Sequence, residues 1–103
     1  MIRHIVLVRL APELPAGEWE DLTAGLDGLR AEIPGMLAFA PLANVSPEEP
    51  VIHGFRHGFT VDFTDAAARD RYLDHPGHKA LGARLVAACD GGLDGLLVFD
   101  HDL

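Results

Sequence analysis

The sequence predicts one α+β domain of the ferredoxin-like type, with the element order β-α-β-β-α-β and a four-stranded antiparallel sheet. Three observations predict this class. The length of 103 residues suits a single domain, residues 1–103. Apolar residues make up 49% of the chain, which is enough for a packed core. Their spacing changes between the period of a strand and the period of a helix in the order given above.

The first strand is predicted over residues 2–10, and both of its faces are largely apolar. One face carries His4, Val6 and Val8, and the other carries Ile5. A strand that is apolar on both sides is usually covered on both sides. Helices cover only one face of a ferredoxin-like sheet, so we expect a second copy of the chain to cover the other.

The first helix is predicted over residues 15–33. Trp19, Leu22 and Leu26 recur there at helical spacing, which indicates one face turned towards a core. Pro34 and the glycine after it end the helix.

Two further strands are predicted on either side of a loop. Residues 36–45 form an extended run in which Pro41 favours an edge position, because proline donates no ladder hydrogen bond. Residues 46–54 contain two prolines and no periodicity, so we expect a loop. Residues 55–63 alternate clearly between apolar and polar positions, as in a strand with one buried face.

The second helical region is predicted to be broken in the middle. Thr64 or Asp65 can cap its beginning, and His75-Pro76 interrupts it because the residue before a proline avoids the helical conformation. A second segment follows over residues 77–89, and the last strand lies within residues 93–103.

The composition excludes some partners and compartments. With 16 acidic and 8 basic residues the formal charge is −8, and Lys79 is the only lysine. We therefore expect no binding to nucleic acid or to an anionic membrane. Cys89 is the only cysteine, so no disulfide forms within the chain, and we expect it to be a small buried side chain. Charges within residues 1–10 argue against a secretory signal, so a cytoplasmic protein is expected.

Several segments together carry a resemblance to a known family. They are MIRHIVLVRL at the beginning, IPG after the first helix, FRHGFTVDFTD in the third strand, YLDHPGHKAL in the second helical region and LLVFD in the last strand. In this order they resemble the stress-responsive A/B barrel (Dabb) family over nearly the whole chain. The resemblance implies a homodimeric α/β barrel, built from two ferredoxin-like protomers that meet through the open face of the sheet.

The resemblance also implies a set of catalytic residues. One branch of the family is a polyketide cyclase, and its catalytic positions match His57, Tyr72, His78 and Asp100 here. By that match His78 is the base and Asp100 orients its ring through a hydrogen bond. Tyr72 and His57 stand on the hydrogen-bonding side of the substrate. His4 matches a residue that lines the same pocket.

We place the pocket between the sheet and the first helix. Its expected substrate-binding residues are His4, Val6, Val8, Leu26, Phe59, Val61 and Leu93. The polyketide cyclase branch carries a tyrosine at the position of Leu26 and another aromatic residue at the position of Leu93. The pocket here is therefore expected to have a different shape and one polar group fewer.

The chemistry of these residues suggests three functions. An imidazole held by a carboxylate is a base near neutral pH, and a tyrosine hydroxyl can polarise a carbonyl group. These parts suffice, without a cofactor, for acid–base chemistry on a small carbonyl or polyketide-like compound. The alternatives are a dimer that binds an apolar or aromatic ligand without turnover, and a cofactor-free monooxygenase. The pair of His78 and Asp100 is equally compatible with a purely structural role.

The remaining histidines are expected to be structural or exposed. His75 and His78 have a spacing that a metal could use, but the proline and glycine between them break the helical geometry, and no HExxH motif is present. We therefore expect no metal and no cofactor. His75 is expected to end a helix, whereas His53 and His101 are expected to be exposed.

Overall fold

The sheet consists of four antiparallel strands in the spatial order β2-β3-β1-β4. A computed structural model describes all residues from 1 to 103. The strands are β1 (Ile2–Val8), β2 (Met36–Ala43), β3 (His57–Phe63) and β4 (Leu96–Asp102). The two sequence-adjacent strands β2 and β3 pair directly, whereas β1 lies between β3 and β4, which come much later in the chain.

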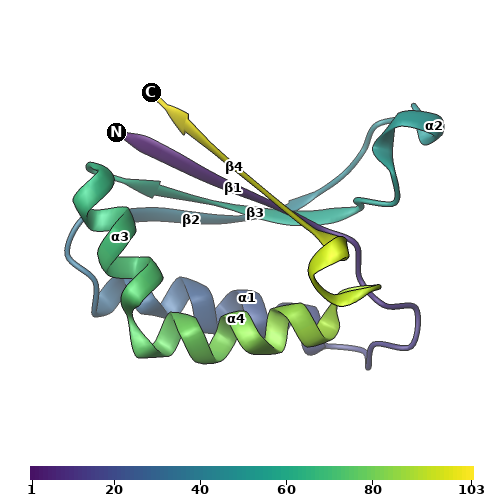
Figure 1. Cartoon of the computed structure of the whole chain (residues 1–103), viewed down its shortest axis with the longest axis horizontal. Helices are drawn as coiled ribbons and strands as arrows, with labels where there is room; N and C mark the ends of the chain where they lie inside the picture. Colours follow the sequence, from purple (N-terminus) through teal and green to yellow (C-terminus); the bar gives the residue numbers. More distant parts are fainter.

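The helices lie on one face of this sheet (Figure 1). They are α1 (Glu18–Gly28), α3 (Ala66–Asp74) and α4 (Pro76–Ala88), with 3₁₀ turns η1 (Leu29–Ala31) and η2 (Gly92–Gly95). A short helix α2 (Glu49–Ile52) projects from the end of the sheet on the side opposite to the other helices. The arrangement confirms the predicted ferredoxin-like α+β fold.

Two local predictions can be compared with the strands and loops directly. Pro41 lies in β2, which is an edge strand as predicted. The prediction of a loop over residues 46–54 is wrong in part, because residues 49–52 form the helix α2. Pro50 explains this helix, since the fixed φ of proline suits a first helical turn. The turn ends at once, because His53 and Gly54 both have positive φ angles.

The predicted break in the second helical region is present, and side chains cap both halves. The Asp65 carboxylate accepts a hydrogen bond of 2.9 Å from the backbone N–H of Ala68 at the beginning of α3. His75 adopts the extended backbone that Pro76 requires, and its Nδ1 accepts a bond of 2.9 Å from the backbone N–H of Gly77. His75 is thus the N-cap of α4, which accounts for it as a structural residue.

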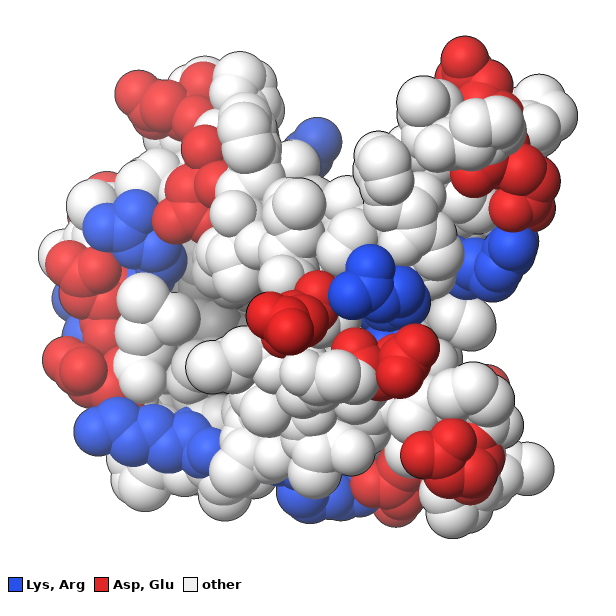
Figure 2. All heavy atoms as spheres, turned by 45° about the vertical axis from the view of Figure 1, so that its right-hand side comes forward, with Lys and Arg blue, Asp and Glu red and all other residues white.

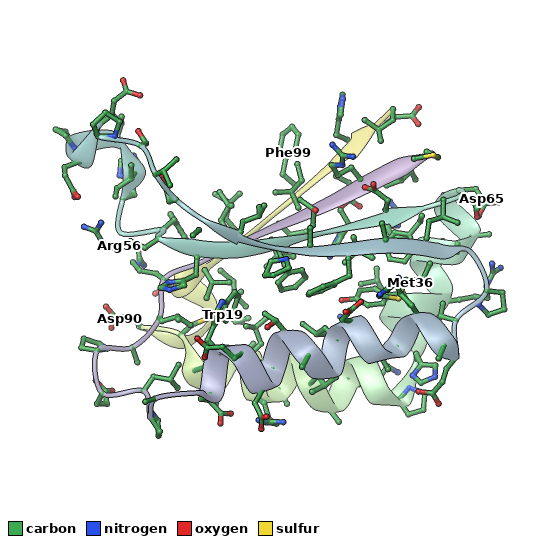
Figure 3. The ribbon with its side chains drawn as sticks, turned by 180° about the vertical axis from the view of Figure 1, so that it is seen from behind. Trp19, Met36, Arg56, Asp65, Asp90 and Phe99 are labelled. Atoms are coloured by element: carbon green, nitrogen blue, oxygen red, sulfur yellow. The ribbon has the colours of Figure 1, made fainter.

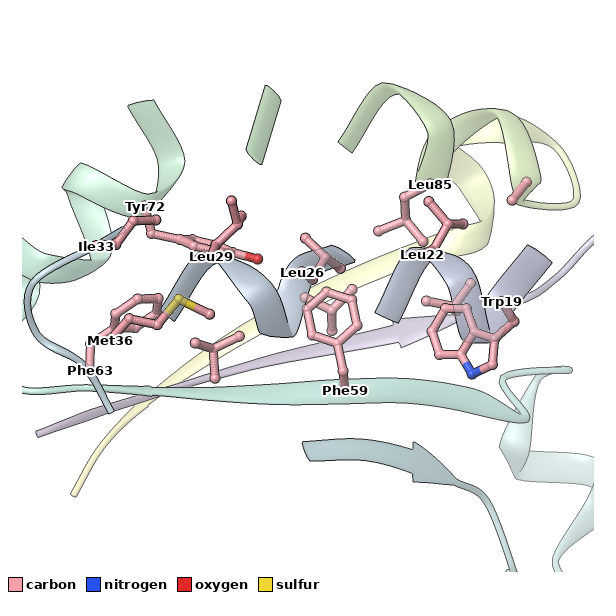
Figure 4. Packing of buried hydrophobic residues seen from close by; sticks show 14 of the residues in the cluster. Trp19, Leu22, Leu26, Leu29, Ile33, Met36, Phe59, Phe63, Tyr72 and Leu85 are labelled. Atoms are coloured by element: carbon pink, nitrogen blue, oxygen red, sulfur yellow. The ribbon is translucent and has the colours of Figure 1, made fainter. Parts of the chain in front are cut away.

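The core fills the space between α1 and the sheet (Figure 4). Trp19, Leu22 and Leu26 point from α1 towards the strands, and Phe59 points from β3 towards the helix. Leu22 and Leu26 are completely buried. Because these large side chains are buried against the strands, the first helix packs closely over the middle of the sheet.

The opposite face of the sheet has no long helix over it, and it carries an apolar surface on β1 and β4. The register places Ile5 beside Phe99 and Leu7 beside Leu97, with all four side chains on the uncovered side. Phe99 is 59% exposed and points away from the helices in Figure 3. A contiguous apolar surface of this kind usually marks an interaction site. None of the helices is long and apolar enough to pass through a lipid bilayer.

Two leucines predicted to line the pocket should respond very differently to truncation. Leu26→Ala is expected to lower the free energy of unfolding by about 2–5 kcal/mol, because it leaves a cavity in the packed core. Leu93→Ala, at a side chain 73% exposed, should change it by less than about 0.5 kcal/mol. Urea denaturation measures both, and equal losses would contradict the packing described here.

Candidate functional site

A cavity of about 430 Å³ lies between β1, β4 and α4. Its polar lining is formed by His4, His78, Lys79 and Asp100. The apolar lining includes Val6, Phe59, Leu73, Leu85, Leu96 and Val98. The expectation that the pocket lies between the sheet and the first helix is therefore wrong, because α1 contributes no residue to this cavity. The large side chains of α1 fill the space between that helix and the sheet, whereas the cavity lies between α4 and the edge strand β4.

The Asp100 carboxylate forms the polar part of the sheet wall. Its Oδ1 accepts a hydrogen bond of 2.6 Å from His4 Nδ1, and its Oδ2 accepts one of 3.0 Å from Arg69 Nη1. The predicted contact between Asp100 and His78 is wrong. The reason lies in the register of the sheet, which places His4 directly opposite Asp100 with both side chains turned towards the helices.

His4 is held firmly by this arrangement. Its side chain is 6% exposed, and a carboxylate can only accept, so the proton of the neutral ring sits on Nδ1 and leaves Nε2 free. Arg69 is also affected, because the carboxylates of Asp100 and Asp70 raise the pKa of its guanidinium above the ordinary value. The imidazole that the carboxylate orients is thus His4, which was expected only to line the pocket.

His78 stands on the helical wall of the cavity. Its Nδ1 donates a hydrogen bond of 3.3 Å to the backbone carbonyl of Leu73, so Nε2 of the neutral ring carries a free lone pair. Burial lowers the pKa of His78 below its usual 6.5, and the neighbouring His4 and His75 act in the same direction. The hydrogen bond to Leu73 opposes this shift but does not cancel it. His78 is therefore a neutral base at pH 7.

Tyr72 packs behind both imidazoles. Its ring centroid lies 4.2 Å from that of His78 and 5.9 Å from that of His4. The hydroxyl is buried and has no hydrogen-bond partner, and it points into the layer beside Leu29 (Figure 4). Burial raises the pKa of this phenol well above its usual 10.0, so the hydroxyl stays protonated.

His57 is not brought to this cavity. It stands at the other end of β3, where its ring meets Trp19 edge-on with the centroids 5.6 Å apart. The strand β3, seven residues long with His57 as its first, runs from that site towards Tyr72. His57 shares a strand face with Phe59 as expected, but only Phe59 lines the cavity.

The predicted substrate-binding residues fall into three groups. His4, Val6 and Phe59 line the cavity. The residues Val8, Leu26 and Val61 are buried in the core and do not line it. Leu93 lies in η2 with most of its side chain in solvent, because the last strand begins only at Leu96.

Sequence reasoning missed several residues of the site. Arg69 carried no local signal, since it reaches Asp100 across 31 positions. Gly82 could have been found from helical spacing, because it follows His78 by four positions and therefore lies beside it on the helix surface. Alternation along β4 likewise places Val98 on the same side as Asp100.

Asp100 and Arg69 form a local ion pair at the site, and the site is not part of a basic patch. On the face in Figure 2, Lys and Arg side chains stand among Asp and Glu. No group of three His, Cys, Asp or Glu side chains is placed to hold a metal ion. The chemistry available from these residues is proton transfer by two imidazoles of fixed tautomer in a largely apolar cavity.

The fold and the cavity define a class: a ferredoxin-like α+β protein with a cavity between its last helix and its edge strand. The chain belongs to the Stress responsive A/B Barrel Domain (Dabb) family, whose pattern it matches over residues 2–102. This confirms the resemblance drawn from the sequence segments.

Three relatives illustrate the family and the fold. An uncharacterised protein of Streptomyces coelicolor is 36% identical over 83 residues, which cover 78% of this chain and 81% of that protein. A dimeric ferredoxin-like protein of unknown function from Jannaschia is 36% identical with a TM-score of 0.87, over 99% of this chain and 98% of that one. The hydroxynitrile lyase of Passiflora edulis is 19% identical with a TM-score of 0.83, over 99% and 92% respectively, and shares the fold.

The lowered pKa of His78 predicts a specific loss of stability in acid. Below pH 6.5 the ring would take up a proton in the unfolded chain, but the folded protein resists protonation until a lower pH. The unfolded state therefore binds more protons, and the free energy of unfolding falls as the pH drops through this window. In His78→Gln this part of the pH dependence should disappear, as measured by urea denaturation between pH 7 and pH 5.

The matched control is His53→Asn, at an exposed histidine far from the cavity. Asparagine tolerates the left-handed backbone of this position, where φ is 53°. This variant should keep the acid dependence of the wild type. A His78→Gln protein that loses stability in acid as steeply as the wild type would contradict the assignment.

Proposed function

We propose that the protein is a cofactor-independent acid–base enzyme that acts on a small carbonyl compound. One observation carries the proposal: the imidazoles of His4 and His78 line one cavity, and the Nδ1 atom of each donates a hydrogen bond to an acceptor of the protein. Both rings thereby keep Nε2 free for proton transfer. A solely structural pair of histidines gains nothing from lining an open and mostly apolar cavity.

The reaction begins with removal of a proton from the carbon next to the carbonyl group. His78 Nε2 takes this proton, and the electron pair of the broken C–H bond moves through the carbon to the carbonyl oxygen, which gives an enolate. The protonated His78 then returns the proton to the enolate oxygen or to another carbon. His4 Nε2, on the sheet wall, accepts the hydrogen bond of the resulting enol. Atoms and electrons balance without a cofactor.

Tyr72 takes the role of a positioning residue in this scheme. Its ring packs against His78 and its hydroxyl is buried away from the cavity, so we assign its contribution to holding the imidazole. Asp100 is likewise a positioning residue, acting through His4. That the fold supports enzymes is illustrated by the protein named hydroxynitrile lyase, although its likeness extends to the fold alone.

A small-molecule-binding dimer without turnover is the second candidate. The cavity serves either function, so volume and apolar lining do not decide between them. The fixed tautomers favour the enzyme, because binding of an apolar ligand alone needs no free imidazole nitrogen on two opposite walls. A test for turnover therefore distinguishes the enzyme from the binding protein.

His78→Gln is expected to slow proton abstraction by about 100- to 10,000-fold, because it removes the base. The probe is 4-phenylbutan-2-one, an uncharged ketone with exchangeable protons next to its carbonyl group. Incorporation of deuterium in D₂O is followed by ¹H NMR. The wild type should accelerate it above buffer, and a wild type no faster than buffer would contradict the proposal.

Two variants control this experiment. His53→Asn, outside the cavity, should exchange the ketone at the wild-type rate. Tyr72→Phe keeps the ring beside His78 and removes only the unpartnered hydroxyl, so it should keep the rate and leave the protein at least as stable. A large loss of rate in Tyr72→Phe would instead make its hydroxyl a catalytic group.

We also propose that two copies of the chain pair through the uncovered face of the sheet. Ile5, Leu7, Leu97 and Phe99 form adjacent cross-strand pairs there, and burial of such a surface is worth roughly 25 cal/mol per Å². Pairing of the two sheets would enclose the apolar side of both and complete the α/β barrel. The relative from Jannaschia, itself dimeric, supports this arrangement.

Charges on this face should separate the protomers. The double variant Leu97→Glu with Phe99→Glu is expected to be a folded monomer in analytical ultracentrifugation, whereas the wild type sediments as a dimer. Leu93→Glu adds a carboxylate at an exposed leucine outside the sheet and should remain dimeric. A double variant that stays dimeric would place the interface elsewhere.

A further inference from the structure

The charged groups around the cavity are unequally paired. Both carboxylate oxygens of Asp100 have partners, with His4 Nδ1 at 2.6 Å and Arg69 Nη1 at 3.0 Å. Lys79 is an exposed residue that lines the same cavity, and its ammonium takes part in none of the ion pairs of the protein. A ligand that enters the cavity therefore meets a compensated carboxylate and an uncompensated ammonium group.

We infer that Lys79 binds a carboxylate of the ligand, so that the ligand is an organic acid with an apolar group. The inference deepens the proposed function and rests on it for the carbonyl group, which narrows the substrate class to oxo acids. The recognition of the carboxylate itself stands on the cavity alone, because it depends only on Lys79 and on the pairing of Asp100.

The position of Lys79 along its helix strengthens an anion site. It lies in the first turn of α4, a helix of 13 residues. The aligned peptide dipoles make this end of a helix positive and favour a negative charge nearby. The rest of the protein, with its formal charge of −8, repels anions. Because the net charge of the protein does not attract anions, the loss of a local attraction in a Lys79 variant should be easy to detect.

The space beside Lys79 is open for the apolar part of such an acid. A Cβ atom added to Gly82 would meet no other atom within 4 Å. Gly82 follows His78 by four positions and Lys79 by three, so it is a neighbour of both on the helix surface, and all three line the cavity. The volume of about 430 Å³ falls in the range of small-molecule sites. A carboxylate at Lys79 leaves the apolar group among residues such as Leu85 and Val98.

The test compares two probes of the same shape, 3-phenylpropanoate and the uncharged 3-phenylpropanamide. Isothermal titration calorimetry should show the acid binding to the wild type about five-fold more tightly than the amide, with a preference that decreases with added salt. In Lys79→Met the preference should vanish, and in Lys79→Arg it should persist. Equal binding of both probes to the wild type, or no binding of either, would overturn the inference.

Two further variants make the result specific. Arg30→Gln removes a cation from η1, away from the cavity, and should keep the preference. Arg30 is exposed and pairs only with Asp27. Gly82→Leu fills the open space and should abolish binding of both probes, whereas Gly28→Leu, equally free of close neighbours but at the end of α1, should not. A preference for the acid that survives in Lys79→Met would show that another group binds the carboxylate.

The two proposals fail in different experiments. Deuterium exchange of the uncharged ketone tests the base and does not involve a carboxylate. Calorimetry with 3-phenylpropanoate tests the anion site and does not involve proton transfer. If the wild type binds the acid but does not accelerate deuterium exchange, the enzyme is rejected and the anion site is kept. If it accelerates exchange but does not prefer the acid, the anion site is rejected and the enzyme is kept.

Discussion

The Asp100 carboxylate is the interaction on which the arrangement of the site depends. It lies on the edge strand β4 and accepts hydrogen bonds from His4 on β1 and from Arg69 on α3. A partly buried carboxylate needs such donors, because an unpaired charge there would be costly to remove from water. With both oxygens occupied, Asp100 joins three elements and fixes one wall of the cavity. The orientation of the His4 ring follows directly from this bond.

The cavity itself results from a difference between the two long helices. From α1, the large side chains of Trp19, Leu22 and Leu26 fill the space above the sheet. From α4, only Leu85 and Ala88 are buried, and Gly82 offers no side chain at all. The site is therefore built where the packing of the helix layer is incomplete. Such a region can take a ligand without any rearrangement of the core, since the other half of the layer already holds the sheet and α1 together.

Much of the fold could be predicted from the sequence because it depends on local patterns. Each of these signals depends on a few neighbouring residues: strand alternation, helical spacing, the edge position of Pro41 and the break at His75-Pro76. The short helix over residues 49–52 was missed, since a single turn has no periodicity to detect. The partner of Asp100 was predicted wrongly for a different reason. The bond to His4 spans 96 positions, and only the register of two strands decides it.

The central claim is that His4, and not His78, is the imidazole held by Asp100. Long-range ¹H–¹⁵N NMR spectra of the histidine rings in the wild type and in Asp100→Asn measure this directly. The account predicts that the substitution moves the ¹⁵N shifts of His4, whereas those of His78 stay in place. A large change at His78 with His4 unaffected would contradict it.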